Sequence, residues 1–178
     1  MKFCCFIGHR NTLSTPELYC QLKTVILHLI QEKNVTFFLF GSKSHFDSLC
    51  LQIVSEIQKE YPHIQRIYVR SQYSYIEEWY KKSLLKNYED TIFPSGLDNA
   101  GKSSYIKRNK AMIDASDFCV FYYNAEYNPP PRKSYKQAFS NYQSKSGTKI
   151  AYAYAKQKKK EIINLYKQPH ENNLFFKA

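Results

Sequence analysis

The feature that most constrains the fold is a series of short apolar runs, each separated from the next by one amphipathic stretch. The runs are short enough to be strands and too continuously apolar for strands with a face in water. Strands joined by single helices favour a mostly parallel sheet covered by helices on both faces, which is an α/β fold. The predicted strands cover residues 2–7, 35–40, 64–69, 91–93, 117–123 and 161–166.

Local signals predict where the intervening helices begin. Thr15-Pro16-Glu17 combines an N-cap, a first-turn proline and an acidic residue. Ser44 followed by Asp47 resembles a capping box, and Ser103 or Ser104 can cap a helix over residues 105–115. The aromatic, basic segment 71–87 predicts a further helix from the spacing of Ile76, Trp79, Tyr80 and Leu84.

The formal net charge of +11 arises from 26 Lys and Arg residues against 15 Asp and Glu residues. Such an excess favours an anionic partner, namely a nucleotide, a nucleic acid or an acidic surface. A basic surface that only keeps the protein in solution is an equal alternative.

The five cysteines are odd in number and lack a C-x-x-C pair, which indicates buried free thiols in the cytoplasm and no zinc site. No apolar run is long enough to span a membrane, and the N-terminus lacks the pattern of a signal peptide.

Polar residues follow three predicted strands, in Gly8-His9-Arg10, Gly41-Ser42-Lys43-Ser44 and the loop that leads to Ser146-Gly147-Thr148. Carboxyl ends of parallel strands share one edge of the sheet, where ligands of such folds bind, so we expect the three loops to converge. Small residues, hydroxyls and a lysine at a helix N-terminus suit a phosphate group. Each loop alone is equally compatible with a polar turn that caps a helix.

His9 and Arg10 extend this prediction. Arg10 can pair with phosphate through its planar guanidinium, and His9 can donate to the phosphate or act as a base. The alternative is a pair of solvent-facing loop residues.

Other charged residues have weaker signals. Glu77, Glu78 and Asp98 are the acids expected near the cleft if the protein is an enzyme. The basic run 156–160 is either a solvated helix end or a nucleic-acid patch, although no nucleic-acid-binding motif accompanies it.

Three segments resemble a known family. Phe3–Arg10 resembles the opening strand and loop of the YpsA-like branch of the SLOG superfamily, which also includes lysine-decarboxylase-like and DprA proteins. The segment 105–112 with Ser116-Asp117 is similar to its central signature, and 146–164 to its closing one. The resemblance implies a Rossmann-like three-layer α/β/α fold that binds nucleotides or nucleotide-derived signals. It also implies a site lined by Gly8, Arg10, Gly41, Ser42, Arg108, Asn109, Gly147 and Thr148.

The chain departs from its enzymatic relatives at Ala151. Related hydrolases and transferases carry a G-T-x-x-E element whose glutamate acts on the ribosyl carbon or its hydroxyls. Here the element reads Gly147-Thr148-Lys149-Ile150-Ala151, and a methyl group can neither attack nor orient a substrate.

We therefore expect one domain over residues 1–167, with an insert loop at 123–145 that could form a lid, and a tail at 168–178. The expected function is to hold a nucleotide or nucleotide-derived signal, as a sensor or sequestering protein, without turnover and without a metal or cofactor. A hydrolase or transferase of the N-glycosidic bond that uses a different carboxylate is the alternative, and a nucleic-acid-binding protein the third. A homo-oligomer is compatible with each of them.

Overall fold

The computed structural model describes residues 1–41, 44–98, 100–128 and 146–166. Its centre is a six-stranded sheet, ordered β4-β3-β2-β1-β5-β6, in which every neighbouring pair is parallel. The strands are β1 (Lys2–Gly8), β2 (Val35–Phe40), β3 (Gln65–Val69), β4 (Asp90–Ile92), β5 (Phe118–Tyr122) and β6 (Glu161–Asn164). The predicted Rossmann-like α/β fold is confirmed.

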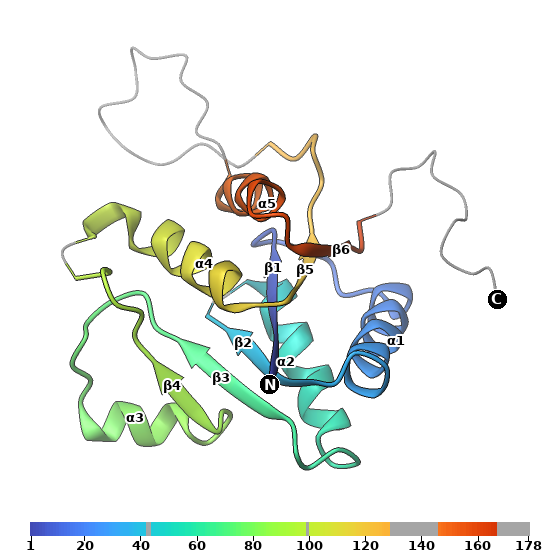
Figure 1. Cartoon of the computed structure of the whole chain (residues 1–178), viewed down its shortest axis with the longest axis horizontal. Coiled ribbons are helices and arrows are strands. Elements are labelled where there is room, and N and C mark those ends of the chain that lie inside the picture. Colours follow the sequence, from blue (N-terminus) through green and yellow to red (C-terminus); the bar gives the residue numbers. More distant parts are fainter. Residues whose placement is uncertain (42–43, 99, 129–145, 167–178) are drawn as a thin grey trace.

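Helices cover both faces of this sheet (Figure 1). One face carries α1 (Pro16–Gln31) and α2 (His45–Ile57), and the other carries α4 (Ser104–Ala115) and α5 (Gly147–Gln157). Successive residues of β1 point to opposite faces, so Cys4 and Phe6 join the first apolar cluster, and Cys5 and Ile7 join the second. A strand buried on both faces needs this unbroken apolar run.

Two of the predicted helix starts are confirmed in atomic detail. The Thr15 hydroxyl accepts from the Leu18 N–H (3.2 Å) at the start of α1, and the Ser44 hydroxyl accepts from the Asp47 N–H (3.1 Å) at the start of α2. The third helix begins as predicted, with Ser103 as its N-cap residue, but the Ser103 hydroxyl donates to the Ala100 carbonyl (2.7 Å) and forms no capping bond with α4. A short 3₁₀ turn, η1 (Gly101–Ser103), precedes α4 instead.

The helix predicted within segment 71–87 is confirmed, but it is shorter than that segment and does not pack into the core. Helix α3 (Glu78–Leu84) is short and has no buried residue, and Trp79 is 70% exposed. Its aromatic residues do not belong to the apolar core, although their spacing is that of a core-facing helix.

The cysteine prediction holds for four of five residues. Cys4, Cys5, Cys50 and Cys119 are free and buried, whereas Cys20 is free and exposed on α1. The reason is helical geometry: Leu18, Leu22 and Ile26 take the buried stripe of α1, and Cys20 is two residues away from two of them. Across the described segments, no helix has both the length and the apolar character needed to cross a bilayer.

The connections reverse direction between β1 and β5. The chain leaves β1 through α1 towards β2, and it leaves β5 through α5 towards β6, on the other face. In open α/β sheets such a reversal opens a crevice at the carboxyl ends of the two strands. The topology therefore predicts a ligand site among the residues that follow β1 and β5.

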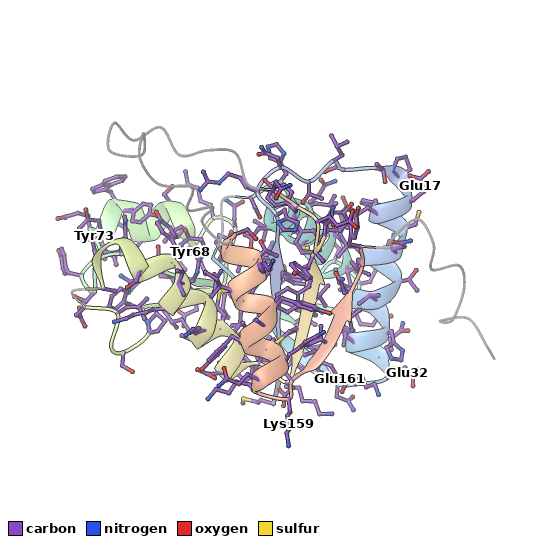
Figure 2. The ribbon with its side chains drawn as sticks, turned by 90° about the horizontal axis from the view of Figure 1, so that it is seen from above. Glu17, Glu32, Tyr68, Tyr73, Lys159 and Glu161 are labelled. Atoms are coloured by element: carbon purple, nitrogen blue, oxygen red, sulfur yellow. The ribbon has the colours of Figure 1, made fainter. Side chains whose placement is uncertain are left out.

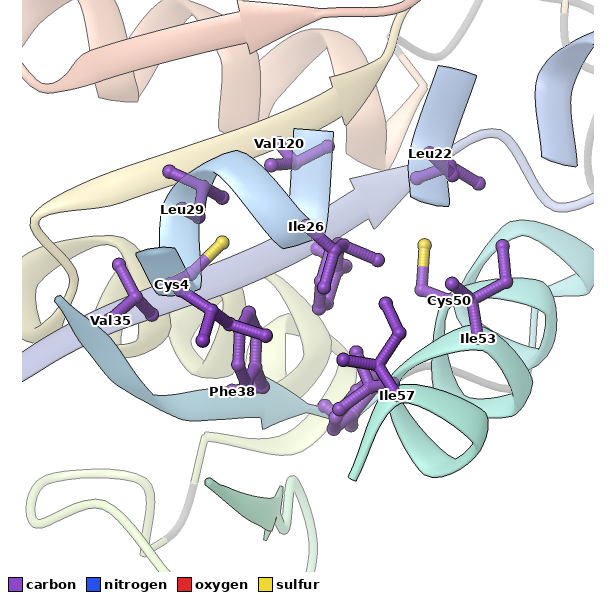
Figure 3. Packing of buried hydrophobic residues seen from close by; sticks show 14 of the residues in the cluster. Cys4, Leu22, Ile26, Leu29, Val35, Phe38, Cys50, Ile53, Ile57 and Val120 are labelled. Atoms are coloured by element: carbon purple, nitrogen blue, oxygen red, sulfur yellow. The ribbon is translucent and has the colours of Figure 1, made fainter. Parts of the chain in front are cut away.

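The apolar cluster between the sheet and α1–α2 supplies a test of core packing (Figure 3). Leu22→Ala removes a fully buried side chain, and we expect it to lower the free energy of unfolding by about 2–5 kcal/mol. Urea denaturation measures the loss. Leu13→Ala is the matched control, because Leu13 is 82% exposed and its truncation should change stability by less than about 0.5 kcal/mol. Equal effects of the two substitutions would contradict this assignment of the core.

Candidate functional site

A pocket of about 600 Å³ opens at the carboxyl edge of the sheet. It lies beyond the ends of β1, β2 and β3, between the first turns of α4 and the segment that leads into α3. Arginines and aromatic side chains dominate its walls. The lining residues are Arg10, Gly41, Tyr68, Arg70, Ser71, Gln72, Tyr73, Tyr75, Ile76, Glu77, Trp79, Tyr80, Tyr105 and Arg108.

The cationic centre of the pocket is Arg108, which projects from α4 and is only 3% exposed. Its Nε donates to the Oδ1 of Asn109 (3.0 Å), and its guanidinium lies over the ring of Tyr105, 5.8 Å from the centroid. Its Nη1 is buried and has no hydrogen-bond partner in the described part of the chain. A buried donor of a charged group normally has a partner, so this nitrogen marks a place for an acceptor.

Burial lowers the pKa of Arg108, and the negative charge of Asp47 opposes that shift. Asp47 lies in the first turn of α2 and is itself 3% exposed. An arginine remains charged even after such a shift. The pocket therefore contains a desolvated positive charge, which interacts more strongly with an anion than an exposed one does.

Gly41 is required by its contact with this guanidinium. A Cβ at Gly41 would lie 2.7 Å from the Arg108 Nη1 and 2.7 Å from the Val69 carbonyl oxygen. Both distances are shorter than side-chain carbons adopt, so only glycine leaves room for Arg108 at the end of β2. The next two predicted residues, Ser42 and Lys43, lie outside the described residues.

Much of the pocket wall was not predicted from the sequence. Arg70, Tyr68, Tyr73, Tyr75 and Tyr105 all line it. Burial raises the pKa of Tyr68, so that its phenol stays protonated. Segment 71–87 is rich in aromatic and basic residues, but that pattern predicted only a helix and no ligand site.

The expected crevice between β1 and β5 is closed by the protein's own groups. The Asn124 N–H donates to the Nε2 of His9 (3.0 Å), and the His9 ring stacks on Tyr127 at a centroid distance of 4.0 Å. The Thr148 hydroxyl donates to the Gly8 carbonyl (2.9 Å). These contacts tie the loop after β1 to the loop after β5 and to the start of α5, so the pocket lies to one side of the switch point.

His9 is therefore held as a neutral ring. The His9 Nε2 lies 3.0 Å from the Asn124 N–H nitrogen and 3.3 Å from the Asn124 carbonyl oxygen, so it accepts from the first in one tautomer and donates to the second in the other. The Nδ1 is buried and has no partner among the described residues. Burial lowers the pKa of His9, and the contact with the Asn124 backbone opposes this only in part.

The remaining predicted residues lie outside the pocket wall, and local packing or hydrogen bonding accounts for most of them. A Cβ at Gly8 would lie 2.5 Å from the ring of Phe46, so packing against α2 explains this glycine. Ser146 caps α5 by accepting from the Lys149 N–H (3.1 Å). Gly147 has open space where its Cβ would be, and Asn109 orients Arg108.

Only one of the candidate acids lies in the pocket wall, and the lysines of the basic run lie outside it. Glu77 lines the pocket, whereas Glu78 and Asp98 do not. Lys160 donates to the carbonyls of Asp114 (2.9 Å) and Ser116 (2.7 Å), so that residue fastens the turn before β6. Within the described segments, no group of three or more His, Cys, Asp or Glu side chains could hold a metal ion.

A comparison with known protein families identifies the family to which this chain belongs. A family model described as the YspA SLOG family matches residues 14–158, which is most of the chain. The chain belongs to this family. The match supports a nucleotide-related binding domain and the YpsA-like branch that the sequence segments resemble. A comparison with curated proteins finds no match.

The matched range covers Gly41, Arg108 and residues 146–148, which the resemblance in sequence predicts to line a site. The matched range begins after the first strand and does not include residues 3–10. The resemblance of that segment to the family therefore rests on its own sequence alone. Of the predicted residues, Arg10, Gly41 and Arg108 share one pocket wall. Gly8, His9 and Thr148 form the adjoining closure around the end of β1.

Two glycines allow a direct test of this geometry. Gly41→Ala should lower the free energy of unfolding by about 1–3 kcal/mol, because the new methyl group displaces Arg108 or the end of β2. Gly147→Ala should change it by less than about 0.5 kcal/mol, because no atom lies within 4 Å of the added carbon. Thermal denaturation of both variants checks the difference, and a Gly41→Ala protein as stable as Gly147→Ala would contradict the contact.

The buried His9 ring predicts a pH dependence. Its folded pKa lies below the unfolded value of about 6.5, so the unfolded chain binds a proton that the folded chain excludes. The contribution of His9 to the free energy of unfolding is fully present above that pH, and it is lost as the pH falls through the folded pKa. His9→Gln should flatten the decline of unfolding free energy with acid, whereas His63→Gln, at an exposed site, should leave it unchanged. Identical pH profiles in all three proteins would exclude His9 as the source.

Proposed function

We propose that this SLOG protein binds a nucleotide or a nucleotide-derived signalling molecule in the arginine-lined pocket, as a sensor or sequestering protein, without turning it over. The observation that carries the proposal is Arg108. Its buried guanidinium retains an unpartnered Nη1 beside the Gly41 backbone, inside a pocket. A phosphate oxygen is the acceptor that a guanidinium pairs with most specifically.

The charges around Arg108 support an anionic ligand. Arg10 and Arg70 also line the pocket, against a single carboxylate, that of Glu77. Arg10 is exposed and follows β1, so its guanidinium can close on a ligand that Arg108 has oriented. A ligand with two or more negative charges would match this excess of positive charge in the pocket wall.

Size and aromatic content favour a nucleotide over a simple anion. A volume of about 600 Å³ is in the range of small-molecule sites and far larger than one phosphate group. Aromatic faces accept any nucleobase by stacking. The family assignment agrees with a nucleotide-related ligand.

Ala151 supports binding without turnover. It is 2% exposed in the apolar cluster between the sheet and α4–α5, and it does not line the pocket. The position where related enzymes carry a glutamate is thus part of the core.

A second candidate function follows from Glu77. It is the one acid from the sequence prediction that lines the pocket, and its side chain makes no hydrogen bond or ion pair with other described residues. A carboxylate beside a bound ribosyl group could act in hydrolysis or transfer at the N-glycosidic bond. This makes Glu77 the residue through which an enzyme would work.

The test is a thermal-shift series with nucleotides and cyclic nucleotide signals, followed by mass spectrometry of the recovered ligand. We expect a raised melting temperature and an intact ligand. Arg10→Ala and Arg108→Lys should each weaken binding by about 10- to 100-fold, the cost of one charge-assisted contact. Lys107→Ala is the matched control, because it removes an exposed cation of the same helix outside the pocket wall.

Three results separate the candidates. Unchanged affinity in Arg10→Ala, the variant least able to disturb the fold, would count against the phosphate assignment. Release of free base, abolished in Glu77→Gln, would establish the enzymatic candidate. Salt-sensitive binding of long DNA or RNA without any nucleotide shift would favour a nucleic-acid-binding protein.

A further inference from the structure

The segment 73–80 exposes four large aromatic side chains at the mouth of the pocket, and three of them are mostly in solvent. Tyr73 is 79% exposed, Tyr75 73% and Trp79 70%, and all three line the pocket. In the view of Figure 2, Tyr73 lies at the periphery of the molecule and Tyr68 nearer its centre. Exposed aromatic residues that gather at a concave site mark a contact surface.

These side chains have no role in the core. No residue of α3 is buried, and the two apolar clusters do not include Tyr73, Tyr75 or Trp79. The ring of Tyr105, 55% exposed, is another aromatic face of the same pocket, contributed by α4. The pocket is therefore aromatic along segment 73–80 and cationic at Arg108 and Arg10.

Arg70 fixes the position of the aromatic segment. Its Nη1 donates to the carbonyls of Tyr73 (2.8 Å) and Ser74 (3.1 Å), and its guanidinium lies over Phe93, 5.5 Å from the ring centroid. Tyr73 has a φ of 60°, a conformation rare for a side-chain-bearing residue, so these bonds support a strained turn. The Arg70 Nη1 is thus engaged by the loop, whereas the Arg70 Nε, like the Arg108 Nη1, is buried without a partner among the described residues.

We propose that segment 73–80 is the base-recognition end of the pocket, with Trp79 and Tyr75 stacking on a nucleobase and Arg70 as the positioning residue of the segment. This inference rests on the proposed function and specifies its ligand. The ligand carries an aromatic base at one end and phosphate at the other, with the phosphate at Arg108 and the base towards solvent. Ribose phosphates and inorganic phosphates that lack a base are then poor ligands.

The chain contains a single tryptophan, Trp79, so its intrinsic fluorescence reports on this end of the pocket alone. The protein is titrated with AMP, GMP, ribose 5-phosphate and pyrophosphate, and free tryptophan in parallel corrects for absorption by the bases. We expect both nucleotides to raise the melting temperature and quench Trp79. Ribose 5-phosphate and pyrophosphate should not quench it and should bind at least fivefold more weakly.

Variants separate stacking from positioning. Trp79→Ala should weaken AMP or GMP binding, measured by calorimetry, roughly 5- to 150-fold, and Trp79→Phe should restore most of it. Arg70→Met should lower the affinity for AMP by a larger factor than the affinity for ribose 5-phosphate, because only AMP would contact the aromatic segment. Leu85→Ala, an exposed residue just after α3 and outside the pocket wall, is the matched control.

The failure of this inference differs from the failure of the proposed function. A nucleotide that raises the melting temperature but binds Trp79→Ala as tightly as wild type, or no more tightly than ribose 5-phosphate, overturns the base-recognition end alone. The absence of both a thermal shift and quenching with every nucleotide overturns the pocket's proposed function as well.

Discussion

The guanidinium of Arg108 lies against the backbone of Gly41 at the end of β2, and much of the carboxyl edge is arranged around it. Its burial imposes three conditions: a strand end without a Cβ, a neighbouring amide at Asn109 and a negative charge at Asp47 in the next helix. A desolvated charge costs several kcal/mol unless it is compensated. The partial compensation leaves the Nη1 without a partner among the described residues, and that nitrogen defines the inner end of the pocket.

The layers of the fold were predictable because each depends on a local pattern. Alternating residues of β1 must suit two different cores, so the run around Cys4–Ile7 has to be apolar throughout. The caps at Thr15 and Ser44 form their bonds within three residues and need no tertiary information. The start of α4 was predicted as well, but its capping bond was not formed, because the preceding 3₁₀ turn directs the Ser103 hydroxyl to Ala100.

The site was predictable only in part, and the reason is again physical. The position of Arg10 and Gly41 after strands follows from the topology of a parallel sheet, and Arg108 came from the family resemblance. The aromatic wall was missed because helical spacing does not reveal which way a helix faces. Trp79 and Tyr80 have the spacing of core residues, yet α3 packs none of its side chains into the core. The closure of the β1–β5 crevice depends on contacts between residues more than one hundred positions apart, such as His9 with Asn124 and Gly8 with Thr148.

The burial of Ala151 also restricts how this chain can change during evolution. Its methyl group lies in the same apolar cluster as Cys5, Met112 and Phe121. A glutamate there would bring a carboxylate into this apolar cluster, at a cost of several kcal/mol unless it found a partner. Replacing Ala151 by an acid would thus need further substitutions around α5. Packing of α5 against the sheet, as well as the chemistry of the site, therefore restricts what this position can hold.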